Sequence, residues 1–247
     1  MLRTRVQFSP PPFTLKNPRK RGEVPALPFR RDLIDDHNCP ISGESKLEEL
    51  FNCRTHGIAW ILSLIGLPVL ILYGYLYGDA WTVAGYSIFG ASLVLLYGVS
   101  TYYHRCQSLH VKRNLRTVDH ICIYILIAGS YSPFTLGPLR ESAGWTLFGL
   151  EWGIVLVGTA LKIFAFDKTK TISLIAYLVM GWLIVLWWPV LGQTVSVTAL
   201  TLVIVGGLSY SFGVIFFLWE KLPYNHAIWH LFVIVGSICH YCAVLLL

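Results

Sequence analysis

Charged residues are scarce in this chain of 247 residues. Asp, Glu, Lys and Arg make up 13% of it, whereas a soluble domain averages about 25%. Hydrophobic residues make up 55%, and the mean hydropathy is +0.61. Of the 32 formal charges, 17 lie in residues 1–54 and 15 in the remaining 193. These values exclude a soluble globular protein and predict a polar tail, residues 1–54, followed by a membrane domain, residues 55–247.

Other patterns are missing as well. The 21 glycines and 12 prolines follow no G-x-y period, which excludes a fibrous protein. The six cysteines have no disulfide-framework spacing, and the single C-x-x-C, Cys239 and Cys242, lies inside an apolar run. The tail has no apolar stretch of 7–15 residues, so we do not expect a cleaved signal peptide. We expect a disordered cytoplasmic tail, with contact to anionic lipid headgroups as the alternative.

The sequence contains several long runs of apolar residues. A membrane-spanning helix needs about 20 mostly apolar residues. Pro189, Gly192 and their neighbours divide one overlong run into two spans, and a further candidate carries Glu151 and Lys162 near its ends. The sequence therefore predicts an all-α bundle of seven transmembrane helices, at roughly 55–78, 80–104, 120–139, 145–166, 171–191, 196–219 and 222–247.

The positive charges predict the orientation of this bundle. Cytoplasmic loops carry an excess of Lys and Arg. In the loops that would face away from the tail, the only Lys or Arg is Arg140. The N-terminus is therefore predicted to be cytoplasmic and the C-terminus outside, in the plasma or inner membrane. Although the formal net charge is +6, its placement in the tail and short loops indicates membrane lipids, not nucleic acid, as partners. The loop cations of the basic side are Arg105, Lys112, Arg113, Arg116, Lys168, Lys170 and Lys221, and Lys162 lies close by at the end of the fourth span.

A few ionisable residues fall inside the predicted spans, where they are costly and therefore indicate function. His104 ends the second span, Asp119 opens the third, and His226 and His230 open the seventh, all on the cytoplasmic side. The i, i+4 spacing of the last two places both imidazoles on one helix face. Three neutral imidazoles suit Zn²⁺ and leave a fourth tetrahedral position for water. Asp119 can then orient that water, and Ser100, one turn before His104, can donate a hydrogen bond to an oxyanion.

A structural interpretation of these residues stays open at this point. A single histidine in a membrane helix is more often a hydrogen-bonded interhelical residue than a metal ligand. A metal site is favoured here because His104 and Asp119 are expected at the same depth in the membrane as the His226–His230 pair. His56 is expected to be an interfacial anchor. His240 lies about 15 Å beyond His230 along the helix axis, which is too far to share a metal.

The pattern resembles the hemolysin III proteins, which are related to the progestin and adiponectin receptor family and more distantly to the alkaline ceramidases. The resemblance covers about residues 48–247. Ser132 stands where that family usually has Thr, and the tail is longer than usual. The matching motifs are Ser100-x-x-x-His104, Asp119, His226-Ala-Ile-Trp229-His230, Glu49-x-x-Asn52-x-x-Thr55-His56-Gly57 and Gly129-Ser130-Tyr131-Ser132-Pro133-Phe134.

The resemblance implies zinc bound by His104, His226 and His230, with Asp119 holding the water and Ser100 close by. It also implies hydrolysis of a lipid amide, so the first hypothesis is a membrane-embedded zinc-dependent hydrolase. The second is a pore-forming cytolysin, the activity behind the family's name, although no ring of intramembrane charges indicates an ion path. The third is a receptor or sensor in which the zinc is structural.

Overall fold

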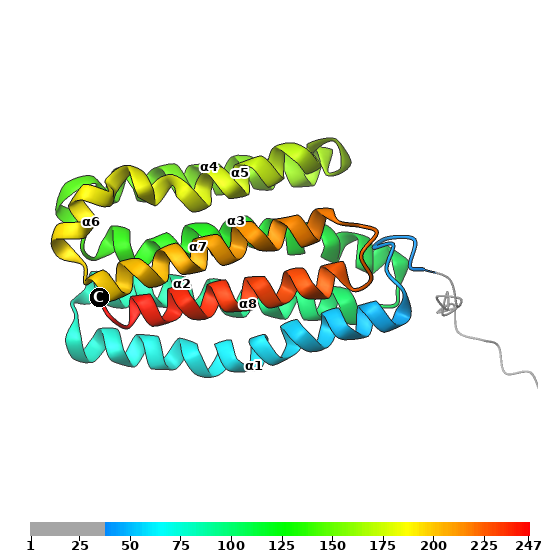
Figure 1. The fold of residues 1–247 in the computed structure, drawn as a ribbon, viewed down its shortest axis with the longest axis horizontal. Coiled ribbons are helices and arrows are strands. Elements are labelled where there is room, and N and C mark those ends of the chain that lie inside the picture. Colours follow the sequence, from blue (N-terminus) through cyan, green and yellow to red (C-terminus); the bar gives the residue numbers. More distant parts are fainter. Residues whose placement is uncertain (1–37) are drawn as a thin grey trace, which may run out of the picture. The chain divides into compact units, whose positions relative to one another are not determined.

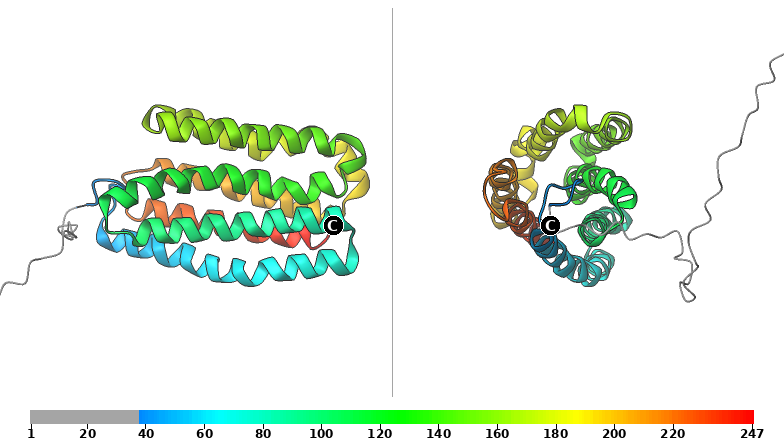
Figure 2. Two further views of the ribbon diagram at one scale, coloured as in Figure 1. Left: turned by 180° about the vertical axis from the view of Figure 1, so that it is seen from behind. Right: turned by 90° about the vertical axis from the view of Figure 1, so that its right-hand side faces the viewer.

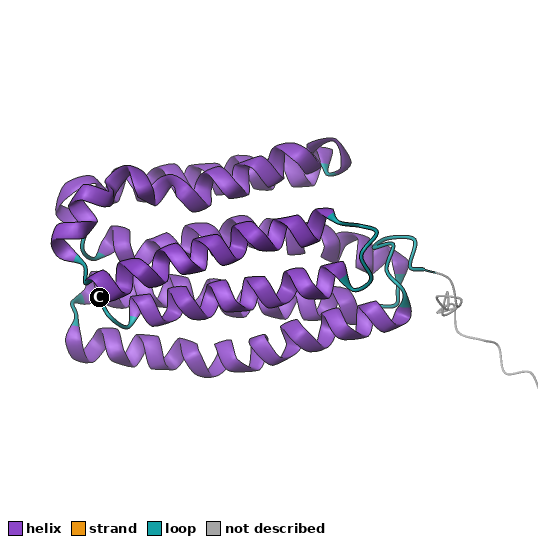
Figure 3. Cartoon of the chain, in the orientation of Figure 1, coloured by secondary structure: helices purple, strands orange, loops and turns teal. Residues whose placement is uncertain are grey.

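The computed structural model describes residues 38–247, and all regular structure in that range is helical (Figure 3). The prediction of an all-α protein is confirmed. The predicted disorder of the tail concerns mainly residues 1–37, which lie outside the described part. The helices are α1 (Lys46–Tyr77), α2 (Ala80–Arg105), α3 (Leu109–Leu136), α4 (Trp145–Ala165), α5 (Lys170–Trp182), α6 (Trp188–Thr194), α7 (Val197–Leu218) and α8 (Asn225–Val244).

Short distorted turns join some of these helices into longer segments. A π-helical turn, Arg140–Gly144, leads into α4, and a 3₁₀ turn, Asp167–Thr169, leads into α5. A second 3₁₀ turn, Leu183–Trp187, connects α5 to α6 just before Pro189. Since Pro lacks an amide hydrogen and fixes its own φ, it fits the first turn of a new helix better than the interior of a continuous one. The fifth predicted span is therefore one segment built from α5 and α6.

Within residues 38–247, six helical segments are long and apolar enough to cross a membrane, and the chain is an integral multi-pass membrane protein. Helix α3 is not one of the six, although it has 28 residues. Its low hydropathy comes from polar residues, of which Lys112 and Asp119 are buried inside the protein. The seventh span and the orientation of the termini stay predictions. The six segments are Lys46–Tyr77, Ala80–Arg105, Arg140–Ala165, Asp167–Thr194, Val197–Leu218 and Asn225–Val244.

Neighbouring helices in the sequence pack against one another, and the last helix returns to the first. α1 packs on α2, α2 on α3, α3 on α4 and α7 on α8, and α8 also contacts α1 (Figure 1). The end view shows α2 and α3 (green) on one side of the bundle and α7 and α8 (orange and red) on the opposite side (Figure 2). Both ends of the membrane domain therefore meet along one seam, which brings the start of α8 next to the start of α1 and the end of α2.

Helix α1 begins well before the predicted domain boundary at residue 55. The side chain of Ser45 accepts a hydrogen bond from the backbone of Glu48, and the Glu48 carboxylate accepts one from the backbone of Ser45. This capping box satisfies two amide groups that would otherwise lack partners at the helix start. The additional turns carry Glu49 and Asn52, both of them buried. Part of the segment assigned to the tail therefore belongs to the helical bundle.

Helices α2 and α3 approach closely where α2 carries glycine. A Cβ atom at Gly85 would lie 2.8 Å from the carbonyl oxygen of Ser132 and 3.0 Å from the Cα of Pro133. Both are backbone atoms of α3, so no side-chain rotation can relieve the overlap. Small residues at such crossings are typical of membrane helix packing.

We therefore expect Gly85→Ala to destabilise the protein by about 1–3 kcal/mol, the usual effect of overpacking. The measurement is the apparent midpoint of thermal unfolding in detergent, with Gly149→Ala as the control. Gly149 lies in α4, and no atom lies within 4 Å of the position that an added methyl group would take there, so that variant should unfold at the wild-type temperature. Equal midpoints for the two variants would contradict this account of the α2–α3 contact.

Candidate metal centre

Three histidines from two helices converge at one end of the bundle. His104 comes from the last turn of α2, and His226 and His230 come from the first turns of α8. One ring nitrogen of each lies within 4.8 Å of the corresponding nitrogens of the other two. The ring centroids are 4.7 to 5.2 Å apart. The sequence predicted these three residues as a set, and the structure places them at distances at which they can hold one metal ion.

The imidazole of His104 is oriented by a carboxylate from α1. Its Nδ1 lies 2.8 Å from Oε2 of Glu49, whereas its Nε2 is buried and has no hydrogen-bond partner. A hydrogen bond from Nδ1–H to the carboxylate leaves the lone pair of Nε2 directed toward the other two histidines. Histidines that bind metals commonly donate their second N–H in this way, which fixes the tautomer and raises the basicity of the ligand. This unpartnered nitrogen fits a bound metal ion.

Glu49 is itself held by a lysine from α3. The Nζ of Lys112 lies 2.9 Å from Oε1 of Glu49 and donates a second hydrogen bond, of 2.8 Å, to the backbone oxygen of Tyr103. Lys112 is fully buried, so its charge depends on this carboxylate. The sequence assigned Lys112 to a loop as an orientation signal, but α3 begins at Leu109 and carries it inside the protein. The contact therefore connects α1, α2 and α3 around His104.

His230 is fixed in a similar way by α1. Its Nδ1 lies 3.1 Å from the hydroxyl oxygen of Thr55, and that hydroxyl donates to backbone oxygens one turn earlier in α1. Thr55 therefore accepts from Nδ1–H and leaves Nε2 of His230 free for a metal. The ring of His56 stacks on His230 with a centroid distance of 3.4 Å. His56 is 3% exposed, so its predicted role as an interfacial anchor is wrong.

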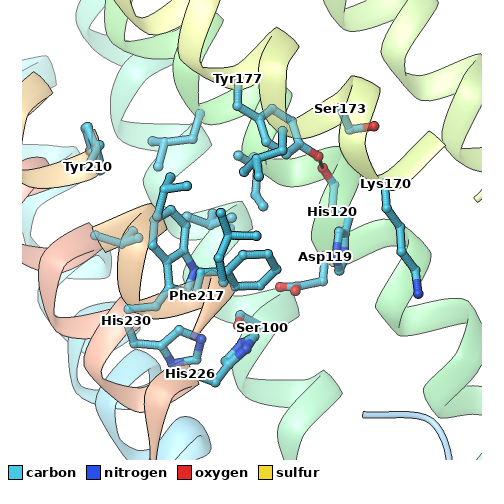
Figure 4. A pocket seen from close by; sticks show the side chains of 18 of the residues that line it. Ser100, Asp119, His120, Lys170, Ser173, Tyr177, Tyr210, Phe217, His226 and His230 are labelled. Carbon is cyan, nitrogen blue, oxygen red and sulfur yellow. Dashed lines mark hydrogen bonds between the residues drawn. The ribbon is translucent and has the colours of Figure 1, made fainter. Parts of the chain in front are cut away.

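Asp119 and Ser100 lie beside the three histidines without joining their ligand group. Both are buried, and the hydroxyl of Ser100 is next to the carboxylate of Asp119 (Figure 4). The carboxylate points into the cavity that the histidines also line, whereas the neighbouring side chain, His120, lies on the side of Lys170. This position is suitable for a group that acts on a molecule in the cavity. The catalytic roles of Asp119 and Ser100 stay predictions.

The cavity has a volume of about 720 Å³ and extends from the histidines toward the middle of the bundle. At the histidine end its walls are polar. Farther along α3, α7 and α8 the walls become mainly apolar, with Leu126, Ile127, Val214 and Val233. A cavity with one polar end and an apolar extension suits an amphipathic molecule such as a lipid.

Replacing Glu49 tests the orientation of His104. With zinc as the probe ion, we expect Glu49→Gln to raise the Kd of the three-histidine cluster by about 10- to 100-fold, because such supporting contacts typically contribute that much to metal affinity. The affinity can be measured by competition with a chromophoric chelator. Glu48→Gln is the matched control, since Gln also completes a capping box and Glu48 does not contact His104. Wild-type affinity in Glu49→Gln would contradict the proposed role of Glu49.

The chain is similar to known proteins over nearly all of this domain. The sequence profile of the family described as "Haemolysin-III related" matches residues 45–241. The chain is 42% identical over 198 residues to "Hemolysin-3 homolog" of Bacillus subtilis, covering 80% of this chain and 93% of that protein. It is 43% identical over 190 residues to "Hemolysin-3" of Bacillus cereus, covering 77% and 87%. It is 33% identical over 224 residues to the human "Monocyte to macrophage differentiation factor", covering 85% and 89%.

Proposed function

From the premise that the chain belongs to the haemolysin-III related family, we propose that it is a zinc-dependent hydrolase of lipid amides, embedded in the membrane. In this proposal the protein crosses the membrane seven times, with its N-terminus in the cytoplasm. The basic loops support that orientation. Helix α3, whose polar side chains are partly buried in the bundle, is the third span in chain order and brings the six apolar segments to seven.

The observation that carries the proposal is the set of three converging imidazoles beside a cavity with an apolar extension. Neutral histidine nitrogens are typical ligands of Zn²⁺, and three of them leave one tetrahedral position for substrate or water, as in catalytic sites. Glu49 and Thr55 hold two of the rings in the tautomer that this requires. When bound there, zinc supplies Lewis-acid polarisation of a carbonyl and a nucleophile at neutral pH.

The residues of the chain supply the other parts of the reaction. Asp119 accepts a proton at its carboxylate from the water that attacks the amide carbonyl. It returns this proton to the amine nitrogen as the C–N bond breaks, so it acts as a general base and then as a general acid. Ser100 donates its hydroxyl hydrogen to the oxygen on which negative charge develops. The apolar part of the cavity holds the acyl chain and excludes water from it. A lipid amide is the proposed substrate class because it has an apolar chain next to a hydrolysable carbonyl.

The test uses purified full-length protein with a panel of N-acyl lipids, and free fatty acid is the measured product. We expect release that stops when zinc is removed by a chelator and returns when zinc is added back. Absence of release from every amide, with zinc still raising the unfolding temperature, would support the receptor or sensor hypothesis instead. Dye release from liposomes that persists in His104→Ala would support the pore-forming hypothesis.

A further inference from the structure

A second group of ionisable side chains lines the same cavity, away from the histidines. Arg116 comes from α3, Lys162 from α4 and Lys170 from the first position of α5. We call these three residues the basic pocket. Arg116 and Lys162 both lie against the ring of Phe166, at 4.4 and 4.8 Å from its centroid. Three cations thus surround one part of the cavity wall.

Lys162 lacks a counter-charge of its own. Only 1% of its surface is exposed, and its ammonium makes no ion pair or hydrogen bond with any other residue in the described range 38–247. The charges that act on its ammonium most are those of Lys170 and Arg116, which repel it. The carboxylate of Asp167, which attracts it, comes next. A lysine that only extended to the membrane surface would place its charge in water. Here the charge lies in the cavity wall instead.

Asp167 cannot balance the basic pocket. Its Oδ1 lies 3.6 Å from Nη2 of Arg116 and 3.4 Å from Nζ of Lys170, and its side chain is 74% exposed. One solvated carboxylate faces three cations, so a net positive charge remains. The carboxylates that line the cavity are Glu44 and Glu48 near the start of α1, Asp119 beside the histidines and Glu220 in the connection between α7 and α8. None of these four is among the charges that act on Lys162.

Uncompensated charge in a protein wall is unfavourable unless an anion pairs with it. We propose that Arg116, Lys162 and Lys170 form a binding site for a phosphate group. A guanidinium donates two parallel hydrogen bonds to phosphate oxygens, and two ammonium groups add point charges. Lys170, whose side chain is 62% exposed, extends the basic pocket to the helix ends where the basic loops lie, which is where lipid headgroups meet a protein. The phosphate is therefore either the headgroup of an anionic lipid or free phosphate from solution.

The site is independent of hydrolysis, so binding tests it directly. The probes are inorganic phosphate, dioleoylphosphatidic acid and, as the uncharged lipid, dioleoylglycerol, each titrated onto the purified full-length protein in detergent. Native mass spectrometry reports lipid retention, and the thermal unfolding midpoint reports phosphate binding. We expect wild type to bind phosphatidic acid at least tenfold more tightly than dioleoylglycerol. Saturation by both phosphate and phosphatidic acid identifies the phosphate group alone as the ligand, and saturation by the lipid only identifies a lipid headgroup.

Variants decide whether the basic pocket is responsible. Lys162→Met and Lys170→Met should each weaken binding of phosphatidic acid by about tenfold or more, since a hydrogen bond to a charged group contributes at least that much. Lys170 is exposed at its rim, so that variant tests the site even if Lys162→Met fails to fold. Lys168→Met is the control, because Lys168 is exposed at the same end and does not line the cavity. Equal weakening by all three variants, or none by Lys162→Met and Lys170→Met, would overturn the proposal.

Discussion

Replacing His230 by alanine is expected to reduce the zinc content of the purified protein from one ion per chain to almost none. His230 is one of three nitrogens within 4.8 Å of one another. Zinc sites with four ligands contribute about 10–16 kcal/mol of binding free energy, so one ligand is worth roughly 3 kcal/mol, or more than a hundredfold in Kd. Elemental analysis by mass spectrometry after dialysis measures the content directly.

The control for this experiment is His240→Ala in the same helix. His240 is also a histidine of α8 that lines the cavity, but it stacks on Tyr210 and lies outside the ligand group. We expect this variant to keep its zinc. A His230→Ala protein that retains a full equivalent of zinc would show that the three imidazoles do not form the metal site.

The second large effect is expected from Asp119→Asn. This variant keeps the shape of the side chain but cannot accept a proton, and loss of a general base typically lowers turnover by about 10²- to 10⁴-fold. Since Asp119 is not within the ligand group of the three histidines, the zinc content should not change. The measurement is the rate of fatty acid release together with metal analysis of the same preparation.

Glu151→Gln provides the comparison for this result. Glu151, in α4, is another buried acid of the membrane helices, and it does not line the cavity. We expect wild-type turnover from it. If Asp119→Asn lost its zinc, Asp119 would be a metal ligand, and if it kept normal turnover, another group would be the base.

The histidine cluster could be predicted because it depends on two regularities that a sequence displays. Apolar run lengths locate the ends of α2 and α8, and the i, i+4 spacing of His226 and His230 determines that they share a helix face. Because charged residues are scarce in the membrane domain, the few ionisable residues within its apolar runs are easy to identify. The all-helical fold follows from the same runs, and residues 45–241 match the family that the motifs indicated.

The supporting residues could not be predicted because they depend on packing between helices. Glu49 and Lys112 are charged, so hydropathy assigned them to the tail and to a loop. Each is nevertheless buried, because each neutralises the other next to His104. Glu49 and Thr55 do occur in a motif at the entrance to the first span. Their sequence positions do not reveal that they contact histidines from the second and last helices.

The seam between α1 and α8 has a consequence for the biogenesis of the protein. Chains are synthesised and begin to fold from the N-terminus, so His104 and its partners Glu49 and Lys112 are available long before α8 exists. Under the proposed function, a nascent chain that ends before α8 offers only one of the three imidazoles and cannot retain the metal ion. Metal uptake would therefore be the last step of assembly in the membrane, and metal occupancy would distinguish completed molecules from chains that stalled or were truncated.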